Sequence, residues 1–219
     1  MNAAVALAPF LYAKIWILPA AYLLGSIPFG RWLLRARKGI RLVGSGGIDA
    51  ADVARDAGLA AGLATMLLDA AKGYFSVWLA AHFTQADIRW MTGAALCAIL
   101  GDMFPIWFGF RGGRGVATAA GAFLGICWTA VALGFSVWLL VLWFWGYVSL
   151  ASISAAAAFP MLMYLLYAPQ HAPPWIVSYG TLLAAALVVL RHRASIRRLL
   201  AGTETRFGPG EPKKGKPRR

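Results

Sequence analysis

The chain has 219 residues, of which 60% are hydrophobic and only 13% are charged, and its formal net charge at pH 7 is +13. A soluble domain of this size cannot bury so much apolar surface, because soluble proteins average roughly 45–50% apolar residues. The apolar runs are continuous rather than alternating, which argues against a transmembrane β-barrel. We therefore expect an all-α, polytopic integral membrane protein. Cys97 and Cys127 both lie in apolar runs and predict neither a disulfide framework nor a zinc centre.

Successive apolar segments predict the membrane spans, each of which needs about 20 apolar residues. They run at about 9–34, 57–82, 88–108, 115–129, 131–150, 152–168 and 174–190. The first segment has no basic region ahead of it, so we interpret it as a retained span and not as a signal peptide.

The division of residues 115–190 is open, because this stretch contains no Lys, Arg, Asp or Glu. Two long crossings or four short ones both fit. We favour four, which gives about seven transmembrane helices. Prolines are expected to break the run near its end, at Pro160, Pro169, Pro173 and Pro174.

The basic residues fall into three groups, from Arg31 to Arg55, at Arg111 and Arg114, and from Arg191 to the end. The positive-inside rule places all three groups in the cytoplasm, the N-terminus outside and the C-terminus in the cytoplasm. This bias, with attraction to anionic membrane lipids, accounts for the net charge without a nucleic-acid partner. We expect one transmembrane domain over residues 1–207 and a basic, disordered cytoplasmic tail over residues 208–219.

A glycine-rich stretch, FGFRGGRGVATAAG, lies between two apolar runs. Gly112, Gly113 and Gly115 have no Cβ, so a ligand can approach backbone N–H groups at the start of the following helix. Arg114 adds a planar fork that matches phosphate oxygens. The stretch predicts a phosphate site at the cytoplasmic boundary of the membrane, although its spacing is not that of a nucleotide P-loop.

The same reasoning applies to Gly44, Ser45 and Gly46, which are followed by Arg55. Topology alone is the commoner explanation for any single basic, glycine-rich loop. Three polar stretches on one side of the membrane favour a shared site.

Five motifs carry a resemblance to a known family. In chain order they are GSIPFG, VGSGGIDAADVAR, LLDAAKG, GDMFPIWFGFRGGRGVAT and RHRASIRRLLAGTE. Over about residues 20–207 the sequence resembles the acyl-phosphate:glycerol-3-phosphate acyltransferase family, PlsY. The resemblance implies a seven-helix enzyme of the bacterial inner membrane that transfers a fatty acyl group from acyl-phosphate to glycerol-3-phosphate. The products are lysophosphatidic acid and phosphate, and no cofactor or metal is implied.

The resemblance also implies roles for particular residues. The expected catalytic residues are Ser45, Arg55, Arg114 and His192. The expected substrate-binding residues are Gly44, Gly46, Gly112, Gly113, Gly115 and Ser195. The family usually has a lysine where Arg114 stands and an asparagine where Ser195 stands. By resemblance the phosphate of the substrate acts as the base, and His192 is an alternative base or phosphate donor.

The first motif departs from the usual GSGNIGATN, most notably at Asp49 and Asp52. A carboxylate ~4 Å from an anionic substrate costs ~4 kcal/mol at an effective dielectric of ~20. We therefore expect these side chains to point away, to pair with Arg55 or another base, or to accompany a different substrate.

Two other acidic residues lie near apolar spans. Asp69 and Lys72 are three residues apart on one helix face and predict an ion pair. Asp102 replaces the histidine of the family's GHxFP, and we expect it to accept from a loop amide or to pair with an arginine.

Two alternatives to the acyltransferase remain. One is a binding or transport protein for an anionic amphiphile that has lost the chemistry, and the other is an acyltransferase with a changed acceptor. His82 and Asp87 also have the H-x-x-x-x-D spacing of acyl-CoA-type acyltransferases. They fall in a loop that the charge bias places outside, so we assign them no catalytic role.

Overall fold

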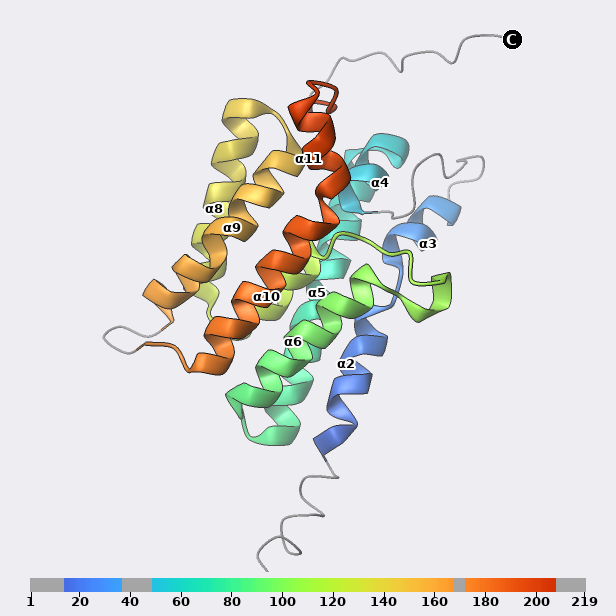
Figure 1. Ribbon diagram of the computed structural model, residues 1–219. Helices are drawn as coiled ribbons and strands as arrows, with labels where there is room; N and C mark the ends of the chain where they lie inside the picture. Colours follow the sequence, from blue (N-terminus) through green and yellow to red (C-terminus); the bar gives the residue numbers. More distant parts are fainter. Residues whose placement is uncertain (1–13, 37–48, 168–171, 208–219) are drawn as a thin grey trace, which may run out of the picture.

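The computed structural model describes residues 14–36, 49–167 and 172–207, which form helices and no strand (Figure 1). The α-helices are α2 (Ile17–Gly25), α3 (Phe29–Ala36), α4 (Ala50–Ala57), α5 (Leu59–Thr84), α6 (Ile88–Met103), α7 (Val116–Leu124), α8 (Trp128–Trp145), α9 (Val148–Leu166), α10 (Trp175–Arg191) and α11 (Arg193–Leu200). A short 3-10 helix, η1 (Ile106–Phe108), precedes the glycine-rich loop. The all-α prediction is confirmed for these residues.

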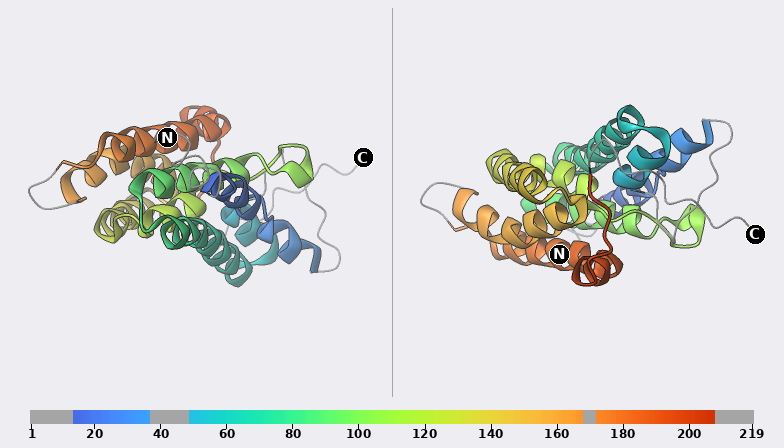
Figure 2. Two further views of the ribbon diagram at one scale, coloured as in Figure 1. Left: turned by 90° about the horizontal axis from the view of Figure 1, so that it is seen from below. Right: turned by 90° about the horizontal axis from the view of Figure 1, so that it is seen from above.

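The helices form one bundle in which α8 and α9 lie on one side and α2 and α3 on the other, with α5 and α6 between them (Figures 1 and 2). The main packed pairs are α5 with α7, α2 with α6, α8 with α9, α4 with α5, α5 with α6, and α9 with α10. This arrangement brings α4, the first residues of α7 and α9, and the last residues of α10 to the same end of the bundle, although they are far apart in the sequence.

Four helical segments in the described part of the chain are long and apolar enough to cross a membrane. They are Ile17–Arg35, Ile88–Phe108, Trp128–Trp145 and Val148–Leu166. A fifth is added if α10 and α11, which meet at an angle of 56°, are one span. Many large apolar side chains face outward; that of Trp143, for example, is 86% exposed. The integral membrane class is therefore confirmed.

The exact number of seven crossings stays a prediction. α5 has 26 residues, but Asp69 and Lys72 lower its mean hydropathy. α7 has only nine residues and is therefore about 14 Å long, about half the ~30 Å thickness of the hydrocarbon core.

Within residues 115–167 and 172–190, which the structure describes, there are four helices, but the breaks between them differ from those predicted. The breaks lie at 125–127 and 146–147, and not near residues 130 and 151. Pro160 was also expected to break the run, and this is wrong, because Pro160 lies inside α9. Neighbouring helices in a membrane bundle can satisfy the backbone groups that a proline frees, so such a helix continues.

Glycines allow the central helices to approach closely. A Cβ at Gly73 of α5 would overlap the carbonyl oxygen of Thr118, and one at Gly121 of α7 would overlap that of Ala70. Close approach through small residues is typical of packing in membranes, where no hydrophobic effect draws helices together. α7 is therefore held directly against α5. Because the glycine-rich loop leads directly into α7, this contact also fixes where the loop ends.

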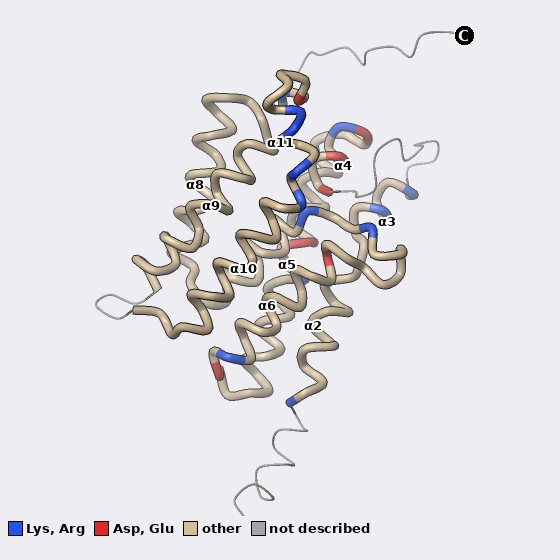
Figure 3. Tube along the Cα trace, in the orientation of Figure 1, with Lys and Arg blue, Asp and Glu red and all other residues tan. Residues whose placement is uncertain are grey.

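Charged residues gather at one end of the bundle, around α3, α4, α11 and the loop before α7 (Figure 3). The opposite end, where α2 and α6 begin, carries few (Figure 3). The convergence expected for the three polar stretches is thus confirmed for their described residues. The orientation of this end toward the cytoplasm stays a prediction.

Candidate active site

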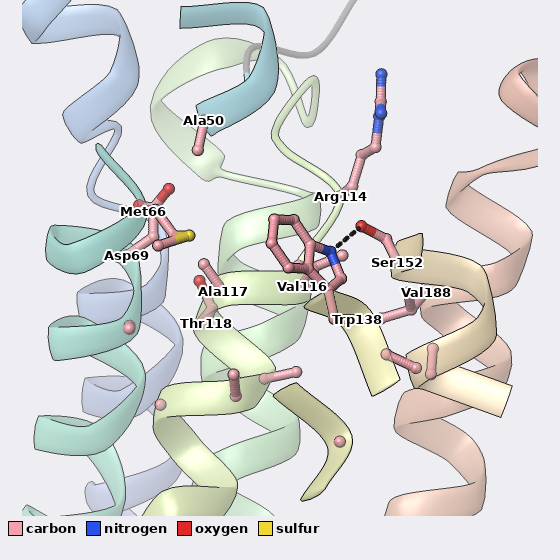
Figure 4. A pocket seen from close by; sticks show the side chains of 18 of the residues that line it. Ala50, Met66, Asp69, Arg114, Val116, Ala117, Thr118, Trp138, Ser152 and Val188 are labelled. Atoms are coloured by element: carbon pink, nitrogen blue, oxygen red, sulfur yellow. Dashed lines mark hydrogen bonds between the residues drawn. The ribbon is translucent and has the colours of Figure 1, made fainter. Parts of the chain in front are cut away.

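A cavity of about 400 Å³ opens between α5, α7, α8, α9 and α10 (Figure 4). Its charged and ionisable lining residues lie toward the charged end of the bundle and are Asp49, Asp69, Asp102, Arg114 and His192. Most of the rest of the lining is apolar, apart from the hydroxyls of Thr118 and Ser152, and includes Val116, Phe123, Leu124, Val131, Phe135 and Phe159. The cavity therefore suits a ligand with a polar head and an apolar chain.

Arg114 lies at the polar end of the cavity and joins two helices. Its Nε is 2.9 Å from Oδ2 of Asp49, the residue that precedes α4. Its Nη1 is 3.5 Å from the hydroxyl of Ser149, in the first turn of α9. The guanidinium is thus fixed between α4 and α9, and a ligand that binds it also reaches these two helices.

The two aspartates of the diverged first motif are paired, as one of the three alternatives expected. Asp49 pairs with Arg114, and Oδ1 of Asp52 lies 3.2 Å from the guanidinium of Arg55. Asp49 also caps α4, because its Oδ1 accepts from the backbone N–H of Asp52 at 2.9 Å. Burial and the neighbouring Asp49 raise the pKa of Asp52 to about 6. Arg55 is not among the residues that line the cavity.

The glycine-rich loop was expected to offer free backbone donors, and for the amides of Gly112, Gly113 and Gly115 this is wrong, because each donates within the protein. The amides of Gly112 and Gly113 donate to the carbonyl oxygens of Met103 and Asp102, at 3.2 and 2.9 Å. The amide of Gly115 donates to Oδ2 of Asp102 at 3.0 Å. The glycines are needed because a Cβ at Gly112 would overlap the end of α6, and because Gly115 has a φ of 78°.

Arginine side chains bind the carbonyl oxygens of the same loop. Arg191, at the end of α10, donates to the carbonyls of Gly112 and Gly113 at 2.8 and 3.0 Å. Arg31 of α3 donates to the carbonyl of Arg111 at 2.7 Å. With its amides and carbonyls both bound, the loop holds the backbone of Arg114 in one orientation.

A buried ion triad supports the loop from the side of α5. Nζ of Lys72 lies 2.8 Å from Asp69 and 2.6 Å from Asp102, and its side chain is 4% exposed. It also donates to the carbonyl of Ile27 at 3.0 Å. The predicted Asp69–Lys72 pair is confirmed, as is the expectation that Asp102 accepts from a loop amide. The charged partner of Asp102 is a lysine, and not the arginine offered as an alternative.

His192 lies at the end of α10, is 1% exposed and lines the cavity. Its Nδ1 is 2.8 Å from the carbonyl oxygen of Val188, which can only accept, so Nδ1 carries the proton. Nε2 is then the nitrogen left to contact a ligand. Ser195 does not line the cavity, and its hydroxyl accepts from Arg198 at 3.0 Å.

Three further polar residues near the site had no role assigned from the sequence. Ser149 donates to Glu204, whose carboxylate also pairs with Arg198. Burial alone would raise the pKa of Glu204, but hydrogen bonds from Arg198 and Ser149 outweigh it and hold this pKa below its ordinary value. The hydroxyl of Thr118 lines the cavity and has no hydrogen-bond partner within the described residues. Thr118 and Glu204 are the last residues of two of the five motifs, and this position was the feature of the sequence that could have marked them as site residues.

Other residues singled out in the sequence lie elsewhere. His82 stacks on Trp78 of α5, and Asp87 caps α6 by accepting from the N–H of Arg89. They have separate structural roles and do not line the cavity. The expected site residues Gly44, Ser45 and Gly46 lie outside the described residues.

Together the fold and the site define a class of protein, a helical integral membrane protein with a cavity that is charged and polar at one end and mostly apolar along its length. Comparison with known proteins places it within this class. The family model for glycerol-3-phosphate acyltransferase matches residues 15–202. The chain belongs to this family, known as PlsY.

Relatives and solved structures agree over nearly the whole chain. The glycerol-3-phosphate acyltransferase of Mesorhizobium japonicum is 42% identical over 90% of this chain and 97% of its own length. That of Geotalea daltonii is 41% identical over 89% and 98%. A crystal structure of PlsY in its glycerol 3-phosphate form has a TM-score of 0.81 and 36% identity, covering 89% of this chain and 96% of that one. Its lysophosphatidic acid form has a TM-score of 0.80 and 35% identity, with 89% and 95% coverage.

Proposed function

We propose that this protein transfers a fatty acyl group from acyl-phosphate to the hydroxyl of glycerol-3-phosphate, in the inner membrane of a bacterium. The products are lysophosphatidic acid and inorganic phosphate. The observation that carries the proposal is the cavity, which places Arg114 and His192, together with three aspartates, at one end of a lining that is mostly apolar. A phosphate at Arg114 leaves the fatty chain of the donor among Val116, Phe135 and Phe159.

Acyl-phosphate as the donor fits the chemistry of the lining. An enzyme that forms a covalent acyl intermediate needs a nucleophile, a base and a group that orients the base. Among the described residues, His192 is oriented by the carbonyl of Val188, and no carboxylate bonds to its ring. Such a site suits a donor that is already activated. An acyl-phosphate is a mixed anhydride, whose carbonyl carbon a correctly placed hydroxyl can attack directly.

In the proposed reaction, Arg114 binds phosphate oxygens, with Ser45 and Arg55 as further contacts. Nε2 of His192 is an alternative phosphate donor in the imidazolium form, in which both ring nitrogens carry a proton. The hydroxyl oxygen of glycerol-3-phosphate attacks the acyl carbon, the ester bond forms and the bond to the phosphate oxygen breaks. The hydroxyl proton passes to a phosphate oxygen of the substrate, with His192 as the alternative acceptor. Positioning of this kind can supply about 7–11 kcal/mol of the barrier. The glycines and Ser195 then act as structural supports around these groups.

The test is lysophosphatidic acid formation by the purified protein from palmitoyl-phosphate and labelled glycerol-3-phosphate. We expect turnover with palmitoyl-phosphate and none with palmitoyl-CoA. Arg114→Ala should lower kcat/KM about 100-fold or more, as the loss of one preorganised charge-stabilising group does elsewhere. Arg89→Ala, at the opposite end of the bundle, is the matched control and should behave as the wild type.

The same assay separates the alternatives. Glycerol-3-phosphate binding without product formation would replace the proposal with a binding or transport role. Turnover only with another alcohol would indicate a changed acceptor. Turnover with palmitoyl-CoA alone would contradict the proposed donor.

A further inference from the structure

The guanidinium of Arg114 has carboxylates along the edge formed by Nε and Nη2. Oδ2 of Asp49 lies 2.9 Å from Nε, and Oδ2 of Asp52 lies 3.9 Å from Nη2. The remaining nitrogen, Nη1, faces the hydroxyl of Ser149 at 3.5 Å. An arginine binds phosphate most strongly through two parallel hydrogen bonds from one edge. At Arg114 this edge already has an anionic partner.

Asp49 is held from two directions, and only one of them involves Arg114. Its Oδ1 accepts from the backbone N–H of Asp52 at the N-terminus of α4, which also carries the positive end of the helix dipole. The carboxylate therefore keeps a partner if Oδ2 loses Arg114. Both side chains of the pair are 18% exposed and line the cavity, so an incoming phosphate can reach the contact between them.

We propose that Asp49 is an internal competitor for the phosphate of the substrate, an inference that rests on the phosphate-binding role proposed above for Arg114. Its carboxylate occupies the Nε edge of Arg114, and glycerol-3-phosphate binds by displacing Oδ2 while Oδ1 stays on α4. Asp49 thus sets the affinity of the site for phosphate groups, of the substrate and of the inorganic phosphate that is released.

The test is Asp49→Asn in the full-length protein. Asparagine is as good an N-cap as aspartate, so α4 is kept while the competing charge is removed. The KM for glycerol-3-phosphate should fall about fivefold, the change expected when an ion pair of ordinary strength no longer has to be broken. The inhibition constant of inorganic phosphate should fall in parallel. The change should fall on KM more than on kcat.

Two variants serve as controls. Asp56→Asn removes the same charge from an exposed position of α4 and should leave KM and phosphate inhibition as in the wild type. Asp49→Glu keeps the charge and should stay closer to the wild type than Asp49→Asn. If Asp49→Asn does not fold, Asp49→Ser replaces it, because serine also caps helices well.

An unchanged or raised KM in Asp49→Asn, together with unchanged phosphate inhibition, would overturn the inference while leaving the acyltransferase proposal intact. Absence of lysophosphatidic acid from the wild type would instead contradict the proposed function. In that case calorimetric titration with inorganic phosphate decides the role of Asp49, because tighter binding by Asp49→Asn supports competition and equal or weaker binding refutes it.

Discussion

Single residues at the site do more than the motif roles assigned to them. Arg114 was expected as a phosphate ligand, and it also ties α4 to α9 through Asp49 and Ser149. Asp102 accepts from the Gly115 amide through one carboxylate oxygen and pairs with Lys72 through the other. Each of these side chains therefore contributes to stability as well as to the proposed chemistry, and substitutions at them have to be tested for both.

Asp52 gives a prediction about stability and pH. Because its pKa is raised from 3.8 to about 6, the folded protein binds a proton that the unfolded chain releases between these pH values. The free energy of unfolding should therefore fall as the pH rises from about 4 to about 6, with a contribution of about 1–3 kcal/mol. Asp52→Asn should remove this part of the pH dependence. Melting temperatures in detergent at several pH values measure it, and parallel curves for wild type and variant would contradict it.

Residue types were predicted more reliably than their partners. The resemblance identified Arg114 and His192, and both line the cavity. Pairing of Asp49 with a basic residue was one of the alternatives, but Arg114 as its partner was not predictable, because it depends on how α4 packs against the loop. The direction of the loop amides was also missed, since a glycine pattern fits both a free phosphate-binding loop and a loop bonded to the preceding helix.

At the scale of helices, the crossing of α5 and α7 positions the site. Gly73 and Gly121 lie where the two backbones meet, and neither position has room for a side chain. α7 is also too short to span the membrane alone, so it depends on α5 for its position. The crossing therefore fixes the start of α7 relative to Lys72 of α5 and its two aspartate partners.

Gly121→Val tests this crossing. The added side chain would overlap the backbone of Ala70, so α5 and α7 would have to separate. We expect a loss of about 1–3 kcal/mol or more of folding free energy, as in overpacked cores, and a loss of activity. The control is Gly134→Ala in α8, where a Cβ would have its nearest neighbour at 3.4 Å. Equal thermal stability of Gly121→Val and the wild type would contradict the proposed role of the crossing.

At the scale of the whole molecule, the charged groups mark one end of the bundle (Figure 3). The class of fold and the convergence of distant motifs followed from composition and from the distribution of Lys and Arg. Helix ends within residues 115–190 did not, because a stretch without charged residues offers few signals. The predicted break at Pro160 was wrong for a different reason, because the effect of a proline on a helix depends on the neighbouring helices.

Membrane orientation can be tested with two cysteine variants. Arg111 is exposed at the charged end and Arg89 is exposed at the opposite end. In a background with Cys97 and Cys127 replaced by alanine, Arg111→Cys should react with an impermeant maleimide only from the cytoplasmic side. Arg89→Cys should react only from the outer side. Labelling of both positions from one side would contradict the predicted topology.

The bonding of the glycine-rich loop limits which changes of length the chain tolerates. Amides on both sides of Arg114 are bound by α6, and the carbonyls of Gly112 and Gly113 are bound by Arg191, so the residues from Gly112 to Gly115 have a fixed register. One inserted or deleted residue here would exchange Arg114 with a neighbour and break these bonds together. The turn between α5 and α6 has no such constraint from the site, so natural length variation is expected there first.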